Sequence, residues 1–257
     1  MTSPPEKIPA ATVEHADCLE FAARQPAGEF RLIYLDPPFF TGRQFASRGD
    51  AGGGFADAWE SLADYLAFLR VRLEAIHPLL ARDGALLLHL DWRTVHYAKV
   101  ICDEIFGIDR FQNELIWSYN SGGGSKRRYG RKHDTILWYG VGPQPYFDAD
   151  AARVPYDAVI ATKRAHLFNP DGKVSGDVLT ISRPPNHAKE WTGWPTQKPL
   201  ALLRFLVRCH TAPGDLVGDF FAGSGTTLLA AALEGRRARG CDVSAEAVAL
   251  ATQRLNG

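Results

Sequence analysis

The fold of this chain is decided by the stretch Gly218-Asp219-Phe220-Phe221-Ala222-Gly223-Ser224-Gly225-Thr226-Thr227. An apolar run that starts at Leu216 leads into it, and the helical pattern of Leu228, Leu229 and Leu233 follows it. A strand, a glycine turn and a helix in this order allow backbone N–H groups to approach a ligand at a helix N-terminus. The stretch therefore predicts a ligand-binding βα unit in an α/β sheet.

Two common ligands of such turns are disfavoured by the residues present. A P-loop requires Gly-Lys-Ser/Thr at the helix start, whereas this chain has Gly225-Thr226-Thr227 and no lysine to reach phosphates. The dinucleotide fingerprint requires a third glycine where Leu228 stands. The strand expected at residues 237–241 ends at Asp242, which follows Asp219 at roughly the 20-residue spacing of an acid that binds ribose hydroxyls. The pattern indicates a small ligand that contains a ribose.

Other segments extend the same architecture. Residues 31–35, 85–90 and 216–220 are short apolar runs, as buried parallel strands are. From Leu62 to Leu80, apolar residues at steps of four and three predict a long helix, which Pro78 kinks or stops. Helical patterns separate the strands, so we predict an α/β fold with a mostly parallel, twisted sheet and helices on both faces.

Length and composition agree with one globular domain. At 257 residues, with 46% hydrophobic and 23% charged residues, the chain is neither disordered, collagen-like nor a coiled coil. Its 29 basic and 29 acidic residues balance, so a polyanion would have to meet a local patch. The start has no apolar signal segment and no stretch is long enough to span a membrane. We therefore expect a soluble, cytoplasmic protein.

The cysteines and the absence of a ligand cluster argue against a metal site. Cys18, Cys102, Cys209 and Cys241 are far apart and form no C-x-x-C pair. This spacing disfavours a zinc knuckle and a disulfide framework. We expect buried reduced thiols and no bound metal.

A second motif, Asp36-Pro37-Pro38-Phe39, directly follows the strand predicted at residues 31–35. Proline fixes φ and offers a carbonyl but no N–H, so the motif is a rigid array of acceptors at the sheet edge where α/β folds bind ligands. Acceptors beside the aromatic face of Phe39 suit a planar base, whose NH₂ group is held by both hydrogens while its ring stacks. A purely structural Pro-Pro turn with a buried Phe is the alternative.

These motifs, together with Pro195-Thr196-Gln197-Lys198-Pro199, resemble those of the S-adenosylmethionine-dependent DNA amino-methyltransferases, which modify adenine N6 or cytosine N4. The order, with the catalytic motif first and the glycine motif last, is similar to that of the circularly permuted β group. The resemblance covers most of the chain and implies a Rossmann-like methyltransferase fold. In that fold the helix predicted at residues 245–255 is followed by one more parallel strand, and here residues 12–15 would supply that strand.

The resemblance implies S-adenosyl-L-methionine as the cofactor. It places Asp17 and Cys18 beside the adenine of the cofactor, Asp242 at the ribose hydroxyls, and Thr196 and Lys198 at the methionine carboxylate. The loop that would bind the methionine part consists of Asp219, Phe220, Phe221, Ala222, Gly223, Ser224, Gly225, Thr226 and Thr227. One departure is Phe220, where the family usually has proline. Asp36 can also pair with the sulfonium or ammonium group.

The catalytic residues implied are Asp36, Pro37, Pro38 and Phe39, which would act on a base flipped out of duplex DNA. The Asp36 carboxylate and the Pro37 carbonyl would hold the amino group, and Phe39 would stack on the ring. Cytosine C5 chemistry is disfavoured because no cysteine follows a proline. Asp-Pro-Pro-Phe favours adenine N6, since Ser-Pro-Pro is commoner in the cytosine enzymes, and cytosine N4 is the alternative.

The region between Tyr119 and Trp194 is rich in glycine and X-Pro pairs. It predicts an irregular target-recognition insertion at residues 121–194, between catalytic parts at 1–120 and 195–257. The run Lys126-Arg127-Arg128-Tyr129-Gly130-Arg131-Lys132 carries five cations, and we expect it to clamp DNA phosphates rather than to form a merely solvated surface. Weaker candidates for contact with the DNA groove are Arg183, Lys189, Trp191 and Trp194.

Further polar residues are expected to line the pocket with no assigned chemistry: Asp57, Trp59, His89, Asp91, His133 and Asp134. The partner that these features imply is double-stranded DNA, and a cognate restriction endonuclease and a homodimer are compatible with the resemblance. Other interpretations keep the fold and change the substrate to RNA or to a protein glutamine, or keep DNA binding and lose catalysis, as in a non-catalytic subunit.

Overall fold

The computed structural model describes residues 11–46, 54–119, 124, 126–156, 169–183, 188 and 190–257. Within these residues the centre is an eight-stranded sheet of order β1-β12-β11-β2-β5-β7-β6-β10. Its strands are β1 (Ala11–His15), β2 (Phe30–Leu35), β5 (Leu80–Leu90), β6 (Phe111–Ser118), β7 (His133–Gly140), β10 (Val178–Thr180), β11 (Leu216–Asp219) and β12 (Arg237–Asp242). Only β7 runs antiparallel to its neighbours among these strands, so the prediction of a mostly parallel sheet is confirmed.

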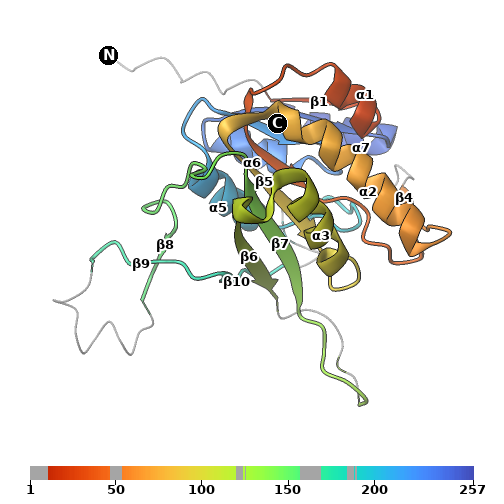
Figure 1. Ribbon diagram of the computed structural model, residues 1–257, viewed down its shortest axis with the longest axis horizontal. Coiled ribbons are helices and arrows are strands. Elements are labelled where there is room, and N and C mark those ends of the chain that lie inside the picture. Colours follow the sequence, from red (N-terminus) through yellow and green to blue (C-terminus); the bar gives the residue numbers. More distant parts are fainter. Residues whose placement is uncertain are drawn as a thin grey trace.

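Helices cover both faces of the sheet. One face carries α1 (Cys18–Ala23), α2 (Leu62–Ile76) and α3 (Val95–Phe106), and the other carries α5 (Leu200–His210), α6 (Thr226–Leu233) and α7 (Ala245–Asn256). Figure 1 shows α2 and α3 in front of the sheet and α5 behind it. Each layer buries its own apolar cluster against the sheet, which is the three-layer α/β arrangement expected from the sequence.

The helix predicted from Leu62 shows how the sequence sets the ends of an element. The Ser61 hydroxyl accepts a hydrogen bond from the Asp64 N–H and caps the start of α2. Apolar side chains three and four residues apart face the sheet and are buried. The α-helix ends at Ile76, and Pro78 follows in a single 3₁₀ turn, as the missing N–H of proline requires.

The N-terminal strand takes the place expected for it. β1 pairs in parallel with β12, with His15 opposite Asp242. The strands β1, β12, β11 and β2 therefore end at the same edge of the sheet. Four acids lie at this edge. Asp17 and Asp36 come just after β1 and β2, and Asp219 and Asp242 are the last residues of β11 and β12. The topology thus gathers the acids of the sequence motifs.

The range 121–194 is not one continuous excursion from the sheet. β7 lies inside this range and forms the middle of the sheet between β5 and β6, and β10 extends the edge beside β6. Two small hairpins lie outside the sheet: β8 (Arg153–Val154) with β9 (Lys173–Val174), and β3 (Arg43–Ala46) with β4 (Gly54–Asp57). The described residues of this range that belong to no strand lie before β7 and between β7 and α5.

All four cysteines are free and buried. Among the described residues no helix is both long and apolar enough to cross a membrane. The same part of the chain holds no group of three or more His, Cys, Asp or Glu side chains arranged around a metal ion. Lys189, a weaker candidate for groove contact, lies outside the described residues.

Candidate active site

A cavity of about 640 Å³ opens at the carboxyl edge of the sheet. Every residue predicted for catalysis or cofactor binding lines it except Gly225, and it brings together segments that are far apart in the sequence. Its walls include Asp17 and Cys18 after β1, Asp36 to Phe39 after β2, Thr196 and Lys198 before α5, and the loop after β11 with Asp242 at the end of β12. This volume is that of a small-molecule site.

The loop between β11 and α6 depends on its glycines. Gly225 caps α6 with φ of 72°, and a Cβ there would lie 2.7 Å from the Cβ of Ala251. Arg254 of α7 donates to the Ser224 carbonyl (2.6 Å) and to the Thr226 hydroxyl (3.0 Å). The positive φ and the close approach both require glycine at residue 225, and the hydrogen bonds from Arg254 fasten the loop to α7.

The two acids predicted to meet the adenosine part also fasten the backbone around the cavity. The carboxylate of Asp242 accepts from the N–H groups of Gly223 (2.8 Å) and Ser244 (2.9 Å). Asp17 caps α1 through the Leu19 N–H (2.8 Å) and pairs with Arg72 (2.7 Å). Each carboxylate is thereby fixed in direction, and each keeps oxygen lone pairs for ligand hydroxyl or amino groups.

Asp219 is the acid most altered by its surroundings. Its pKa is raised to about 7, mainly because the carboxyl is buried. Hydrogen bonds from Thr227 and from the Phe221 N–H lower the pKa in part, and the nearby charges of Asp36 and Asp242 raise it. Burial also raises the pKa of Asp242. A cation bound beside these two carboxyls would favour their charged form, against the effect of burial.

Phe220 stands where the resembling family usually has proline, and its side chain packs beneath the loop. It is 1% exposed, and its ring lies 5.1 Å from that of Phe21 and 5.7 Å from that of Phe30. The loop therefore keeps its path through burial of an aromatic ring in the core.

Lys198 lies on the catalytic motif itself. Its ammonium pairs with Oδ2 of Asp36 and lies 5.2 Å from the centre of the Phe39 ring, and the residue is only 7% exposed. The expectation placed this lysine at the cofactor carboxylate, whereas the structure places it at Asp36. Oδ1 of Asp36 is buried and accepts no hydrogen bond from the described residues. An acceptor in this state calls for a donor from a ligand.

Asp57 has a role that the sequence did not reveal. It closes β4, lines the cavity and accepts hydrogen bonds from the backbone that follows Pro38. Trp59, which also lines the cavity, donates its indole N–H to the same carboxylate (3.2 Å). The expectation that both residues line the pocket is confirmed.

His89, Asp91, His133 and Asp134 do not line the cavity, so this part of the expectation is wrong. His89 is buried behind Tyr34, whose hydroxyl lies 2.6 Å from the histidine Nδ1, and its Nε2 lies 3.5 Å from Asp134. Burial lowers the pKa of His89. Tyr34 does line the cavity, but a tyrosine within an apolar strand gives no signal that separates it from core residues.

Trp194 and Arg183, two of the weaker candidates for contact with the DNA groove, contact other parts of the protein in the structure. Trp194 is 5% exposed and lines the cavity, where its indole Nε1 would lie 3.1 Å from a Cβ added at Gly223. It is thus part of the pocket wall and not a groove residue. Arg183 pairs with Asp134 and lies over the ring of Tyr119, 4.0 Å from its centre.

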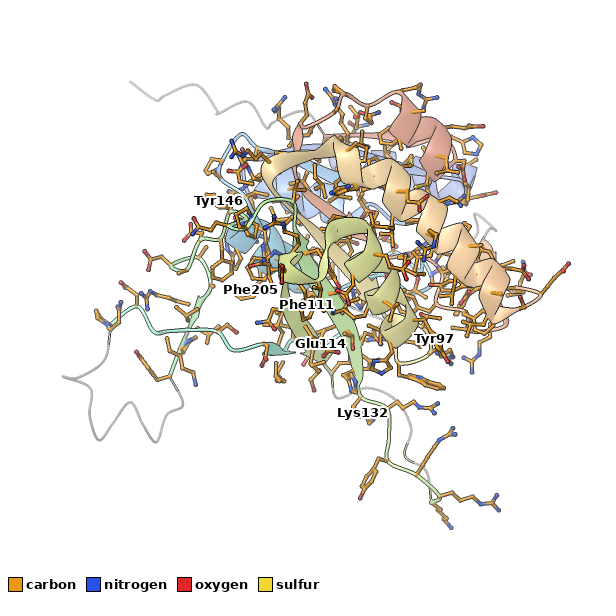
Figure 2. The ribbon with its side chains drawn as sticks, in the orientation of Figure 1. Tyr97, Phe111, Glu114, Lys132, Tyr146 and Phe205 are labelled. Atoms are coloured by element: carbon orange, nitrogen blue, oxygen red, sulfur yellow. The ribbon has the colours of Figure 1, made fainter. Side chains whose placement is uncertain are left out.

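The basic run leaves the sheet at the edge that carries the cavity. Because β7 is antiparallel to β5, its first residues lie beside the last residues of β5, with Thr135 opposite Leu90. Lys126, Arg127, Arg128 and Arg131 are exposed, and the Arg131 guanidinium lies 3.4 Å from the centre of the Trp92 ring. Figure 2 shows Lys132 near the base of the loop that precedes β7.

The chain is similar in sequence and in fold to known DNA methyltransferases. The family of N6/N4 DNA methylases matches residues 30–253. The chain is 30% identical to the DNA adenine methyltransferase YhdJ of Escherichia coli (strain K12), over 96% of this chain and 83% of that protein. The M1.HpyAVI–SAM complex (22% identity, TM-score 0.68, 96% and 99% of the two chains) has a similar fold. So has the PvuII cytosine-N4-specific DNA methyltransferase (20% identity, TM-score 0.69, 96% and 86%).

Proposed function

The chain belongs to the S-adenosylmethionine-dependent N6/N4 DNA methylases, and from this premise we propose that it methylates N6 of adenine in duplex DNA. The observation that carries the proposal is the buried, unpartnered Oδ1 of Asp36 in the wall of the cavity, which accepts from none of the described residues. A flipped adenine offers an amino group that donates two hydrogen bonds, which matches this oxygen and the carbonyl of Pro37.

The cofactor would occupy the part of the cavity formed by Asp17, Asp242 and the glycine loop, where it supplies an electrophilic methyl group. The fixed carboxylates of Asp17 and Asp242 fit its amino and hydroxyl groups, and the buried acid Asp219 fits its positive charge. The loop is already held by Arg254, so binding does not have to order it.

The residues of the motif would act on the base. Asp36 and the Pro37 carbonyl hold the two amino hydrogens in the direction that turns the nitrogen lone pair toward the methyl group. The ring of Phe39 stacks on the base. The new N–C bond would form as the S–C bond of the cofactor breaks, with the thioether S-adenosylhomocysteine as the leaving group. The amino nitrogen would then give one of its protons to the Asp36 carboxylate. Lys198 keeps that carboxylate in place through its ion pair.

Two observations support adenine over cytosine. The motif is Asp-Pro-Pro-Phe, and the relative at 30% identity is named as an adenine enzyme. The similar fold of a cytosine-N4 enzyme supports the same mechanism with the other base. The exposed basic run at the cavity edge supports duplex DNA as the substrate, because cations there would neutralise backbone phosphates.

The test is an incubation of the purified protein with S-adenosylmethionine and mixed-sequence duplex DNA, followed by digestion and mass spectrometry of the nucleosides. We expect N6-methyladenine, and we expect none from the Asp36→Ala variant although its circular dichroism and melting temperature match those of the parent. N4-methylcytosine would move the target to the other base. Near-normal turnover by Asp36→Ala would contradict the assigned acceptors.

A further inference from the structure

The turn after the catalytic motif is held by one buried carboxylate, that of Asp57. The residue is 1% exposed, and among the described residues five donors converge on its two oxygens. Oδ2 accepts from the N–H groups of Phe39 (3.1 Å) and Thr41 (2.9 Å) and from the Thr41 hydroxyl (2.7 Å). Oδ1 accepts from the Phe40 N–H (2.8 Å) and from the Trp59 indole (3.2 Å).

Asp57 binds the first backbone N–H groups that the chain offers after Asp36. Pro37 and Pro38 have no N–H group, so the Phe39 N–H is the first donor that follows Asp36. Three successive N–H groups then point at one carboxylate, as in the backbone nests that bind anions. The turn also needs outside support, because Phe40 adopts a left-handed φ of 61° that a side chain disfavours.

Asp57 also joins the turn to the wall of the cavity. Its backbone carbonyl accepts from the Gly42 N–H (2.9 Å), and it lies opposite Arg43 in the register of the β3–β4 hairpin. In the same hairpin Phe45 and Phe55 stack at 5.0 Å and line the cavity. One residue therefore fixes both the exit of the catalytic motif and the hairpin beside it.

We propose that Asp57 is a positioning residue, which sets the direction of the Asp36 and Pro37 acceptors by holding the turn at residues 39–41. The inference rests on the proposed function, because it gives Asp57 a task in presenting the target base. The cofactor side of the cavity is fastened separately, by Arg254 and by Asp242. Loss of Asp57 should therefore slow methyl transfer and spare cofactor binding.

A carboxylate, and not merely a side chain of this shape, is needed at residue 57. An ionised aspartate only accepts hydrogen bonds, whereas an asparagine amide replaces one oxygen with an NH₂ group that would face the donors of the turn. Asp57→Asn should lower kcat on the order of 10²-fold, which is the effect of about 1 Å of misplacement at a reacting group. The dissociation constant of S-adenosylmethionine should change by much less than kcat, since Asp17, Asp242 and the glycine loop are held by contacts that do not involve Asp57.

The control is Asp103→Asn, which alters another hydrogen-bonded carboxylate outside the cavity. Asp103 on α3 accepts from the Tyr139 hydroxyl (2.6 Å) and pairs with Lys99 (2.7 Å). We expect this variant to keep the parent kcat. A milder variant, Thr41→Val, removes one hydroxyl donor and keeps the fold, so it should give a smaller loss of kcat with unchanged cofactor affinity.

The outcomes separate this inference from the proposed function. Parent-like kcat in Asp57→Asn, with Asp36→Ala inactive, would overturn the inference and leave the function standing. An equal loss of cofactor affinity and kcat would also overturn it, because the effect would then not be confined to the base. Activity in Asp36→Ala would instead count against the proposed function. Should Asp57→Asn fail to fold, a Thr41→Val variant with parent-like kcat would overturn the inference.

Discussion

Asp219 closes β11 with its carboxyl enclosed by the protein and facing two other acids, Asp36 and Asp242. Burial raises its pKa to about 7, so at neutral pH the group is divided between its two protonation states. A bound cation favours the ionised state, whereas burial by itself favours the protonated state. We therefore expect the charge of this one residue to couple cofactor binding to pH.

The affinity for S-adenosylmethionine should rise as the pH increases from 6 to 8, by up to about tenfold for each pH unit below the pKa of Asp219. Calorimetric titration at several pH values measures this, with Asp219→Asn as the comparison that should flatten the dependence. An equally steep dependence in Asp219→Asn would assign the effect to another group. The stability of the cofactor-free protein should depend on pH in the opposite direction, because the folded state raises the pKa of this carboxyl. Its contribution to the free energy of unfolding is fully present below about pH 4 and is lost as the pH rises through about 7.

Among the elements, the loop before β7 is distinguished by its charge and by its place at the sheet edge. It contains five cations, and it emerges where β5 ends, beside Asp91 and Trp92. Stacking of Arg131 on Trp92 holds the end of the loop near the protein body. Phosphates of a duplex whose base enters the cavity would lie within reach of such a loop.

Replacing Lys126 and Arg128 with alanine should weaken DNA binding and leave cofactor affinity and kcat at saturating DNA unchanged. For each phosphate that the variant no longer neutralises, the slope of log K against log salt concentration should become shallower by about 0.9. Fluorescence anisotropy over a salt series measures this slope. The matched control is Arg82→Ala with Arg237→Ala, two exposed cations at the opposite, amino edge of the sheet, and an equal effect of both pairs would contradict a local role of the loop.

At the scale of the whole molecule, the two ends of the chain build one sheet and one site. β11 and β12 from the C-terminal part lie between β1 and β2 from the N-terminal part. Phe220 joins these parts, because its ring packs against Phe21 of α1 and Phe30 of β2. The glycine loop is thus seated on a core to which both ends of the chain contribute.

Phe220→Ala should lower the free energy of unfolding by about 3–5 kcal/mol, as truncation of a buried phenylalanine does. Phe220→Leu should cost less, because it fills more of the space that the ring occupied. Urea denaturation measures both. A loss under about 1 kcal/mol for Phe220→Ala would show that the loop side and the N-terminal side do not share one core.

The sequence by itself determined the features that neighbouring residues decide. Apolar runs and glycine positions were enough to predict β2, β11, α2, α6 and the ligand loop, because period and allowed φ are local properties. The position of β1 beside β12 was predicted through the resemblance that the sequence motifs carry. The motifs likewise predicted which acids meet at the sheet edge.

Only the tertiary structure decided how distant side chains are paired. Lys198 pairs with Asp36 although 162 residues separate them, Asp57 holds the turn after Pro38, and β7 lies in the middle of the sheet between β5 and β6. Such pairings depend on strand register, on side-chain rotamers and on which groups are left unpaired when the core closes. These quantities are set by the packing of the whole chain, and so no local pattern contains them.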